Sequence, residues 1–431
     1  MNELPRRLTL LDATTIVAGT IIGVGIFLVP AALAREVPSA SAIMLIWAMA
    51  GAVSMLGAFA YAELGAMLPQ SGGQYVYLRE AYGPLPAFLA GWSFFTIIQS
   101  GSIAAVATGC GLYVRHFIPG LPPAVTAITL ILALTAINYV GVKLGARVQV
   151  LFTALKLSGL GLLIVSAFFH EGGTNINAAL PAALPATSVG IAFLAAFVAY
   201  DGWHVIAFVG GEVINPKRNL PLALVLGLSI SIVVYLLANL AYLHVLPMAD
   251  LVGSSRVAAD TATVTIGAWG ASFVTLTIVL STIGAANGSI LTAPRIYFAQ
   301  ARDGLFFRRF GEVHPRFRTP GFSIAVQGVW TSVLASSGSY EQLIAYVLFV
   351  SWMFHGATVL AVPVLRRKKP DMPRPYRMWG YPVAPFLFVV FAAWFVATTL
   401  VSRPQSSIVG GLLLLSGVPV YYYWRKKANV G

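Results

Sequence analysis

The sequence places three groups that could bind a charged ligand inside otherwise apolar stretches of chain. Lys156 lies in the stretch 148–169, and Asp201 lies in the stretch 187–211. The third group is the glycine-rich segment 19–25, whose letters are GTIIGVG and whose main chain could expose amides and carbonyls. A charged side chain at the centre of a bilayer costs about 2.5–3.5 kcal/mol, so such residues usually serve a function. Together these groups suit electrostatic recognition of a small molecule.

The same sequence offers no motif for catalysis or metal binding. Cys110 is the only cysteine, which excludes a disulfide framework and a cysteine metal cage. The six histidines show neither HxxxH nor HExxH spacing. No Ser-His-Asp order, pair of neighbouring carboxylates or phosphate-binding loop is present. The sequence therefore predicts no metal, no cofactor and no enzymatic activity.

The composition is that of a protein embedded in a lipid bilayer. Of the 431 residues, 58% are apolar and 10% are charged, whereas soluble domains carry roughly 25% charged residues. This composition excludes a cytosolic enzyme, a fibrous repeat and a disordered chain. Several apolar stretches approach the ~20 residues that cross a bilayer as a helix. We expect an all-α membrane protein.

Apolar stretches and the polar residues between them predict twelve transmembrane helices. The expected spans are 12–34, 41–68, 84–114, 122–141, 148–169, 187–211, 219–245, 263–300, 321–338, 341–365, 381–401 and 405–424. An even number of spans places both termini on one side of the membrane. The loops on that side hold 22 of the 27 Lys and Arg residues, and the opposite loops hold 4. The positive-inside rule therefore predicts cytoplasmic termini, and it explains the net charge of +13 without nucleic acid.

Two of the expected spans are interrupted by residues that weaken a helix. The interruptions are segment 19–25 in the first span and segment 199–203 in the sixth, five spans later. Because five is an odd number, a span five positions later crosses the membrane in the opposite direction. The first five spans and the next five could therefore be inverted repeats. We expect repeats at 1–169 and 187–365, with 381–431 forming two additional helices. The alternative for the first interruption is a helix-packing face of the small-xxx-small type.

Broken helices can recognise a zwitterion with their main chain alone. The second half of a broken helix starts with free N–H groups, and its first half ends with free C=O groups. We expect a substrate carboxylate on the amides of 23–25, and a substrate ammonium on carbonyls near 20–21 and 198–201. This arrangement fits an L-amino acid. The residues expected to contact it are Thr20, Ile21, Gly23, Val24, Gly25, Phe197, Val198, Ala199, Tyr200 and Asp201.

The two charged residues leave different alternatives open. Lys156 is too far from either end of its span for a snorkelling position, so we expect a fixed cation within the bundle. Its expected partners are main-chain carbonyls near Gly19 and the hydroxyls of Ser281 and Thr282. Asp201 could face the substrate, handle a proton, or cap the freed amides of the second half-helix.

Longer motifs make the chain resemble the L-type amino acid transporters of the amino acid–polyamine–organocation superfamily. They include YAELGAMLPQSGGQYVY at 61–77, AYDGWHVIAFVGGEVINPKRNLP at 199–221 and LSTIGAANGSILTAPRIYFAQARDG at 280–304. The resemblance implies a LeuT-like fold of five plus five helices in inverted repeats, with helices 1 and 6 broken, plus helices 11 and 12. It also implies that the glycine segment binds the carboxylate, and that Lys156 occupies the place of sodium in related symporters.

Several departures from the family pattern qualify the resemblance, and one of them is Gly211-Glu212 in place of the usual acidic pair before the INP motif. Val24 stands where a serine is usual, so only main-chain donors remain for the carboxylate. Val198 stands where a bulky residue usually covers the substrate, with Phe197 beside it. The loop 115–123 lacks the cysteine through which animal members join a single-span subunit, so we expect no disulfide-linked heavy subunit.

We therefore expect a sodium-independent transporter of L-amino acids in the plasma membrane, working as an exchanger of neutral amino acids by alternating access. A proton-coupled amino acid symporter is the first alternative. A receptor that binds amino acids without transporting them is an alternative of another class. The expected partners are small amino acids and the lipid bilayer.

Overall fold

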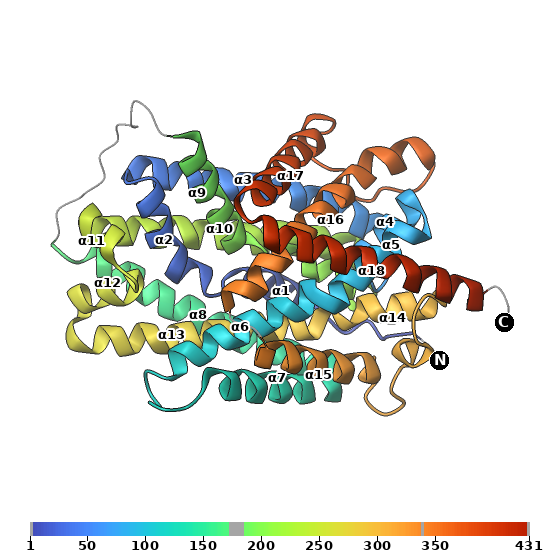
Figure 1. Ribbon diagram of the computed structural model, residues 1–431, viewed down its shortest axis with the longest axis horizontal. Coiled ribbons are helices and arrows are strands. Elements are labelled where there is room, and N and C mark those ends of the chain that lie inside the picture. The colour runs from blue at the N-terminus through green and yellow to red at the C-terminus, as the bar shows by residue number, and fades with distance from the viewer. Residues whose placement is uncertain (1–2, 172–184, 338–339, 429–431) are drawn as a thin grey trace.

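The protein is described by a computed structural model that covers residues 3–171, 185–337 and 340–428. It is a bundle of helices, and both ends of the chain lie at the same end of that bundle (Figure 1). Within the described ranges, the one β-type pairing is an isolated bridge between Leu8 and Val213. The helical fold that the sequence predicts is confirmed.

Eleven helical segments of the described chain are long and apolar enough to cross a membrane. They coincide with eleven of the expected spans, and the expected ninth span is the 17-residue helix α15. The helices are α1 (Leu10–Ile21), α2 (Gly25–Glu36), α3 (Ala40–Met67), α4 (Gln74–Tyr82), α5 (Pro84–Ser93), η1 (Phe94–Ile98), α6 (Gln99–Val114), α7 (Pro123–Val140), α8 (Val142–Phe168), α9 (Ala186–Tyr200), η2 (Trp203–Glu212), α10 (Pro216–Val245), α11 (Met248–Gly253), α12 (Val257–Ile266), η3 (Gly267–Trp269), α13 (Gly270–Thr292), α14 (Pro294–Arg302), η4 (Arg308–Gly311), α15 (Gly321–Ser337), α16 (Tyr340–Lys368), α17 (Val383–Ser402) and α18 (Pro404–Ala428).

Both expected helix breaks are present. In the first span α1 ends at Ile21 and α2 begins at Gly25, and in the sixth α9 ends at Tyr200. Gly202 then adopts a φ of 111°, which an L side chain rarely tolerates, before the 3₁₀ helix η2 begins. Because α2 packs against α9, and α1 against η2, the two breaks lie together within the bundle.

The three glycines of the first span differ in their roles, although the sequence suggests a common need for flexibility. Gly23 lies in the unwound segment, but Gly19 is helical and Gly25 is the first residue of α2. A Cβ on Gly25 would lie 2.8 Å from the Cβ of Ala199, so this glycine permits the close approach of the two broken spans. A Cβ on Gly19 would overlap the side chains of Gln149 and Thr153. Close packing therefore explains two of the three glycines.

The third span contains a short π-helix that the sequence does not announce. This segment, η1, leads directly into α6, and Gln99 is the first residue of α6. A π-helical turn adds a residue to the local helix and rotates the side chains that follow. Gln99 thereby lies among the residues that surround the broken spans.

Ion pairs join helices at the end of the bundle that holds both termini. Glu212 receives two hydrogen bonds from Arg295, at 2.6 and 3.1 Å, and both side chains are buried. Glu63 likewise accepts from Arg366 and from the main-chain amide of Met378. Both carboxylates are therefore paired with an arginine of another helix.

A more exposed group of charges surrounds α4 at the same end. Arg79 forms an ion pair with Asp303, and Glu80 forms one with Lys369. Burial alone would raise the pKa of Glu80, but hydrogen bonds from Lys369 and Arg79 outweigh it and hold that pKa below its usual value. The Glu80 carboxylate therefore stays charged at neutral pH.

The contact between α2 and α9 gives a test of the packing. A Gly25→Ala variant should lose about 1–3 kcal/mol of stability, because its methyl group overlaps Ala199 in a well-packed region. Gly161→Ala is the matched control, since a Cβ there meets no heavy atom within 4 Å. Thermal unfolding of both variants in detergent measures the difference. Equal midpoints for the two would contradict the close approach of α2 and α9.

Candidate functional site

The two helix breaks face a cavity of about 100 Å³ at the centre of the bundle. Residues of α6, α13 and α16 complete its wall, including Gln99, Ser102, Val106, Ala285, Ser289, Val347 and Leu348. Eight of the ten residues expected to contact a substrate line this cavity: Thr20, Ile21, Gly23, Val24, Gly25, Val198, Ala199 and Asp201. The chain thus brings the segments 20–25 and 198–201 to one small space.

Two of the expected contact residues lie outside the cavity wall. Phe197 packs with Trp352 and Phe395, at ring-centre distances of 5.1 and 6.2 Å. Tyr200 packs with Trp47 and Tyr235 instead. Residues three apart share one face of a helix, so both rings point away from the face that carries Val198. Phe197 therefore does not supply the bulk that Val198 lacks.

Main-chain amides at the start of α2 are available for an anion. The amides of Val24, Gly25 and Ile26 donate no hydrogen bond to another described residue, and no side chain caps this helix. The amide of Gly23 differs from the expectation, because it already donates to the carbonyl of Ile21 at 2.8 Å. The amides without a hydrogen-bond acceptor therefore start one residue later than the sequence suggests.

A tyrosine that the sequence analysis missed connects the carbonyls of the two breaks. The hydroxyl of Tyr235, on α10, lies 2.8 Å from the carbonyl oxygen of Ile21 and 2.9 Å from that of Ala199. Both carbonyls were expected to receive a substrate ammonium. Each keeps a second lone pair, but the carbonyl of Thr20 is free of any hydrogen bond to the described residues. No sequence pattern within α10 distinguishes Tyr235 from the other residues of this helix.

Lys156 is buried and donates three hydrogen bonds to main-chain carbonyls. Its Nζ lies 2.7 Å from the oxygen of Gly19, 2.6 Å from that of Ile22 and 2.9 Å from that of Ser281. Three acceptors match the three donors of an ammonium group. The expected contacts with Gly19 and with the first helix break are confirmed.

The expected contacts between Lys156 and two hydroxyls are wrong. The hydroxyl of Ser281 donates to the carbonyl of Ile22 at 2.8 Å, while the ammonium binds the main-chain oxygen of Ser281. The hydroxyl of Thr282 donates to the carbonyls of Ile278 and Val279 in its own helix. An unwound segment leaves carbonyls in need of donors, and both Lys156 and Ser281 supply them.

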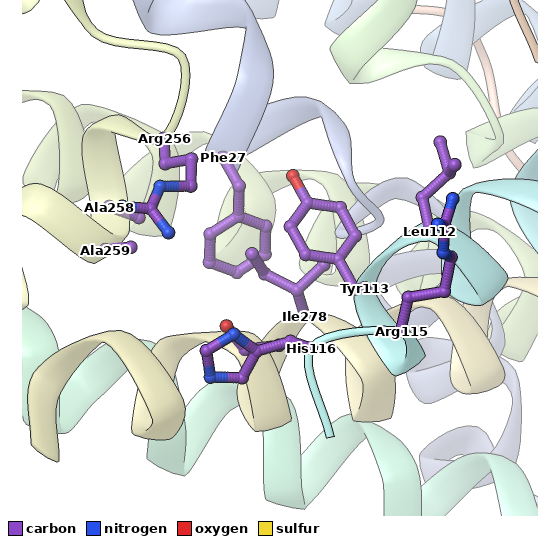
Figure 2. A pocket seen from close by; sticks show the side chains of 10 residues that line it. Phe27, Leu112, Tyr113, Arg115, His116, Arg256, Ala258, Ala259 and Ile278 are labelled. Carbon is purple, nitrogen blue, oxygen red and sulfur yellow. The ribbon is translucent and has the colours of Figure 1, made fainter. Parts of the chain in front are cut away.

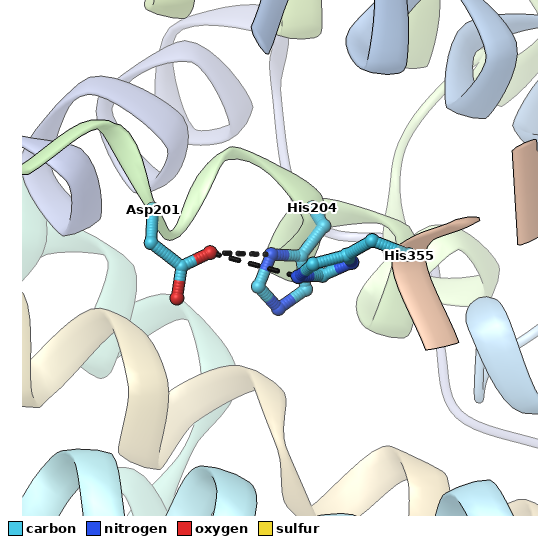
Figure 3. Close-up of side chains that lie close together, drawn as sticks. All are labelled: Asp201, His204 and His355. Atoms are coloured by element: carbon cyan, nitrogen blue, oxygen red, sulfur yellow. Dashed lines mark ion pairs between the residues drawn. The ribbon is translucent and has the colours of Figure 1, made fainter. Parts of the chain in front are cut away.

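Asp201 faces two histidines at the edge of the cavity. Figure 3 shows its carboxylate directed at His204, from η2, and His355, from α16. Its Oδ1 lies 3.5 Å from Nδ1 of His204 and 3.7 Å from Nε2 of His355. No side-chain hydrogen bond caps the first turn of η2, but the main-chain amide of Gly202, just before η2, donates to Asp201, so a capping role stays a prediction. His204 follows Asp201 by three residues, but no sequence spacing could indicate His355.

Comparison with known proteins identifies the family of this chain. The family model for amino acid permeases matches residues 8–421. The chain belongs to the amino acid permease family. It is similar to the human b(0,+)-type amino acid transporter 1, with 33% identity over 98% of this chain and 88% of that protein. It is also similar to the human cystine/glutamate transporter, with 32% identity over 99% of this chain and 87% of that protein.

A bacterial relative matches over almost the same length. The serine/threonine exchanger SteT of Bacillus subtilis (strain 168) is 33% identical over 99% of this chain and 98% of its own. The resemblance to L-type amino acid transporters is therefore confirmed, and the protein is a multi-pass membrane permease for amino acids rather than an enzyme.

The permease has a second hollow, of about 410 Å³, toward the end of the bundle opposite the termini (Figures 1 and 2). Phe27, two residues beyond Gly25 on α2, lines it together with Ile278 from α13. Arg115, His116 and Arg256 are among the polar residues of its wall. Its position makes it a candidate approach to the central cavity.

Lys156→Ala tests whether the buried cation serves transport. Each buried carbonyl that loses its donor costs about 1–3 kcal/mol, so we expect amino acid uptake to fall at least about tenfold. Lys426→Ala, near the exposed C-terminal end of α18, is the matched control. Uptake of labelled amino acid by proteoliposomes measures both. Unchanged uptake by Lys156→Ala would show that the lysine is dispensable.

Tyr235→Phe tests the connection between the breaks. The variant removes one hydroxyl from the carbonyls of Ile21 and Ala199, and we expect uptake to fall about three- to tenfold, the equivalent of about 1 kcal/mol for one hydrogen bond. Tyr242→Phe is a close control on the same helix, because its buried hydroxyl has no hydrogen-bond partner in the described chain. Equal uptake by the two variants would contradict a role for the bridge.

Proposed function

We propose that this permease exchanges neutral L-amino acids by alternating access and needs no sodium. The observation that carries the proposal is the pairing of two main-chain breaks around one small cavity, with a lysine ammonium bound to the first break. Free amides and free carbonyls at helix ends carry partial charges of opposite sign, which suits a zwitterion. The cavity therefore needs no charged side chain to hold an amino acid.

The carboxylate of the substrate would lie on the amides of Val24, Gly25 and Ile26 at the start of α2. Anions bind readily at such a helix start, because the amides point at the ligand and the helix dipole is favourable. The ammonium group would bind the carbonyls of Thr20 and Val198, two further residues of the cavity wall. The Val198 carbonyl also accepts from the amide of Asp201 at 3.3 Å and keeps a second lone pair for the substrate. The side chain would then meet Val106, Val347 and Leu348, whose apolar surfaces favour a neutral amino acid.

Lys156 supports independence from sodium. Its ammonium already donates to three carbonyls that would otherwise need a cation, and it forms no ion pair within the described chain. A covalently attached cation cannot be exchanged for a solvent ion during the cycle. Replacing sodium with choline in the assay buffer should therefore leave the rate unchanged.

The surface charges support an orientation with both termini in the cytoplasm of a cell bounded by its plasma membrane. The Lys and Arg residues of the loops are concentrated on the side of the termini, where Figure 1 places both chain ends. The ion pairs Glu212–Arg295 and Arg79–Asp303 lie at that same end. They would keep the cytoplasmic side closed in this conformation, and they would separate when the cavity opens inward.

The described structure also supports a permease that works without a disulfide-linked heavy subunit. Cys110 is the only cysteine of the sequence, and it is buried within α6. A buried thiol inside a helical bundle cannot reach a cysteine of another chain. Purified protein alone should therefore show full transport in vesicles.

A second candidate function is proton-coupled uptake, and the group Asp201, His204 and His355 favours it. Histidine and aspartate chains inside a membrane often relay protons. In that case the carboxylate or an imidazole would gain and lose a proton during each cycle. The main-chain site and Lys156 would serve both mechanisms equally.

Proteoliposomes distinguish exchange from proton coupling. Under exchange, vesicles preloaded with unlabelled amino acid should take up labelled amino acid at least about tenfold faster than empty vesicles, because the empty carrier returns slowly. Under proton coupling, empty vesicles with an acidic exterior should accumulate substrate. Lys156→Ala vesicles serve as the blank. Accumulation driven by pH alone would contradict the exchange mechanism.

A receptor that binds amino acids without transporting them would give a third set of results in these vesicle experiments. Binding of labelled amino acid to the purified protein, with no uptake in either vesicle experiment, would replace the transport proposal. The same vesicles support a competition series with the twenty amino acids against one labelled substrate. Strong competition by neutral amino acids and weak competition by lysine or glutamate would agree with the proposed substrate class.

A further inference from the structure

We propose that Asp201, His204 and His355 form a binding site for a divalent transition metal such as Zn²⁺, Co²⁺ or Ni²⁺ beside the substrate cavity. One ligand atom of each residue lies within 4.8 Å of the other two. The residues come from the break after α9, from η2 and from α16, so the fold brings them together (Figure 3). Two imidazoles and one carboxylate are a common ligand set for these metals.

The distances within the group fit a shared ion better than direct hydrogen bonds. The carboxylate oxygen is 3.5 Å from Nδ1 of His204 and 3.7 Å from Nε2 of His355. Hydrogen bonds between charged partners are shorter, about 2.7–2.9 Å. Two ligands bound at about 2.0–2.1 Å to one tetrahedral ion lie roughly 3.3–3.4 Å apart. A small inward movement of the side chains would therefore place all three atoms around one ion.

An unpartnered nitrogen points into the same space. Nδ1 of His204 is buried and has no hydrogen-bond partner in the described chain. The residue as a whole is 2% exposed, so water does not readily reach this nitrogen. The Oε1 atom of Gln99 is also buried without a partner, and the Gln99 amide lies 3.4 Å from Nε2 of His204. Turning this amide would let Nε2–H donate to Oε1. The lone pair of Nδ1 would then face Asp201.

In His355, the ring nitrogen that would not bind the metal has a hydrogen-bond partner, as in most metal-binding histidines. Nδ1 of His355 lies 3.2 Å from the hydroxyl of Tyr61, so this nitrogen can carry the hydrogen and leave Nε2 as the ligand. The hydroxyl of Ser351 is 3.0 Å from Nε2, and Ser351 precedes His355 by one helical turn. That hydroxyl can turn to a carbonyl of its own helix when a metal takes its place.

One coordination position would remain open toward the substrate. Asp201 and His204 both line the central cavity, and the side chain of Asp201 is 26% exposed there. Three protein ligands with an open fourth position are typical of zinc sites that bind water or a small molecule. A bound ion would place two positive charges near the carbonyls proposed for the substrate ammonium. Zinc should therefore weaken amino acid binding and slow exchange.

Cobalt binding to the purified permease tests the site directly. The protein is prepared without a histidine tag, and Co²⁺ is titrated while its visible absorption is recorded. We expect one ion per chain, with the intense bands of a four- or five-coordinate ion, and displacement by Zn²⁺. His355→Gln should weaken binding on the order of 100-fold or more, because even an outer-shell change costs 10–100-fold. His116→Gln, in the hollow of Figure 2, should bind like the wild type.

X-ray absorption spectroscopy of the cobalt-loaded wild type identifies the ligands of the ion directly. This measurement does not depend on whether the variants fold. Two imidazole nitrogens among the ligands would support the site. Absence of cobalt binding, the spectrum of the six-coordinate hydrated ion, or equal affinity in His355→Gln would overturn it. Pure proton coupling gives a different pattern, in which no metal binds and the pH dependence of uptake disappears in His355→Gln. That result would also overturn the metal site, while the proposed exchange function is judged separately by the preloaded vesicles.

Discussion

The structure depends on the hydrogen bonds that the Lys156 ammonium donates to main-chain carbonyls. A helix break inside a bilayer exposes carbonyls that no water can satisfy, and each would be costly if left alone. The ammonium serves Gly19 and Ile22 on one side of the break and Ser281 of α13 on the other. Small neighbours admit it, since a Cβ on Gly284 would lie 3.2 Å from Nζ. One side chain thus stabilises an opened helix.

The second break is tied to the first through main-chain contacts and one hydroxyl. Gly25 allows α2 to approach Ala199, and Tyr235 links the carbonyls of Ile21 and Ala199. The two helix breaks are therefore fixed relative to one another. Movement that opens the cavity would therefore have to separate contacts elsewhere, such as the buried pair Glu212–Arg295. Leaving one charge of such a pair buried and unpaired costs about 3–5 kcal/mol. Opening at that end requires new partners for both charges.

Much of the site could be predicted from the sequence, because helix breaks and buried charges are local signals. The glycines around 23, the segment at 199–203 and Lys156 all stand out from apolar surroundings. Tyr235 and His355 could not be found in this way, because they lie within ordinary spans and reach the cavity only through the packing of α10 and α16. The same limit applies to Phe197, whose direction depends on the rotation of α9, and to the π-helix before Gln99.

The two kinds of polar group around the cavity divide the work of recognition. Main-chain amides and carbonyls at the breaks suit the ammonium and carboxylate that all α-amino acids share, so they cannot distinguish one substrate from another. In the proposed binding mode, discrimination must come from groups that would meet the substrate side chain, such as Val347, Leu348 and the carboxylate of Asp201, which line the cavity. The charge near that carboxylate depends on what His204 and His355 bind. A proton or a metal ion there would change the charge that a substrate meets, while the hydrogen bonds from Lys156 and Tyr235 to the main-chain carbonyls would remain.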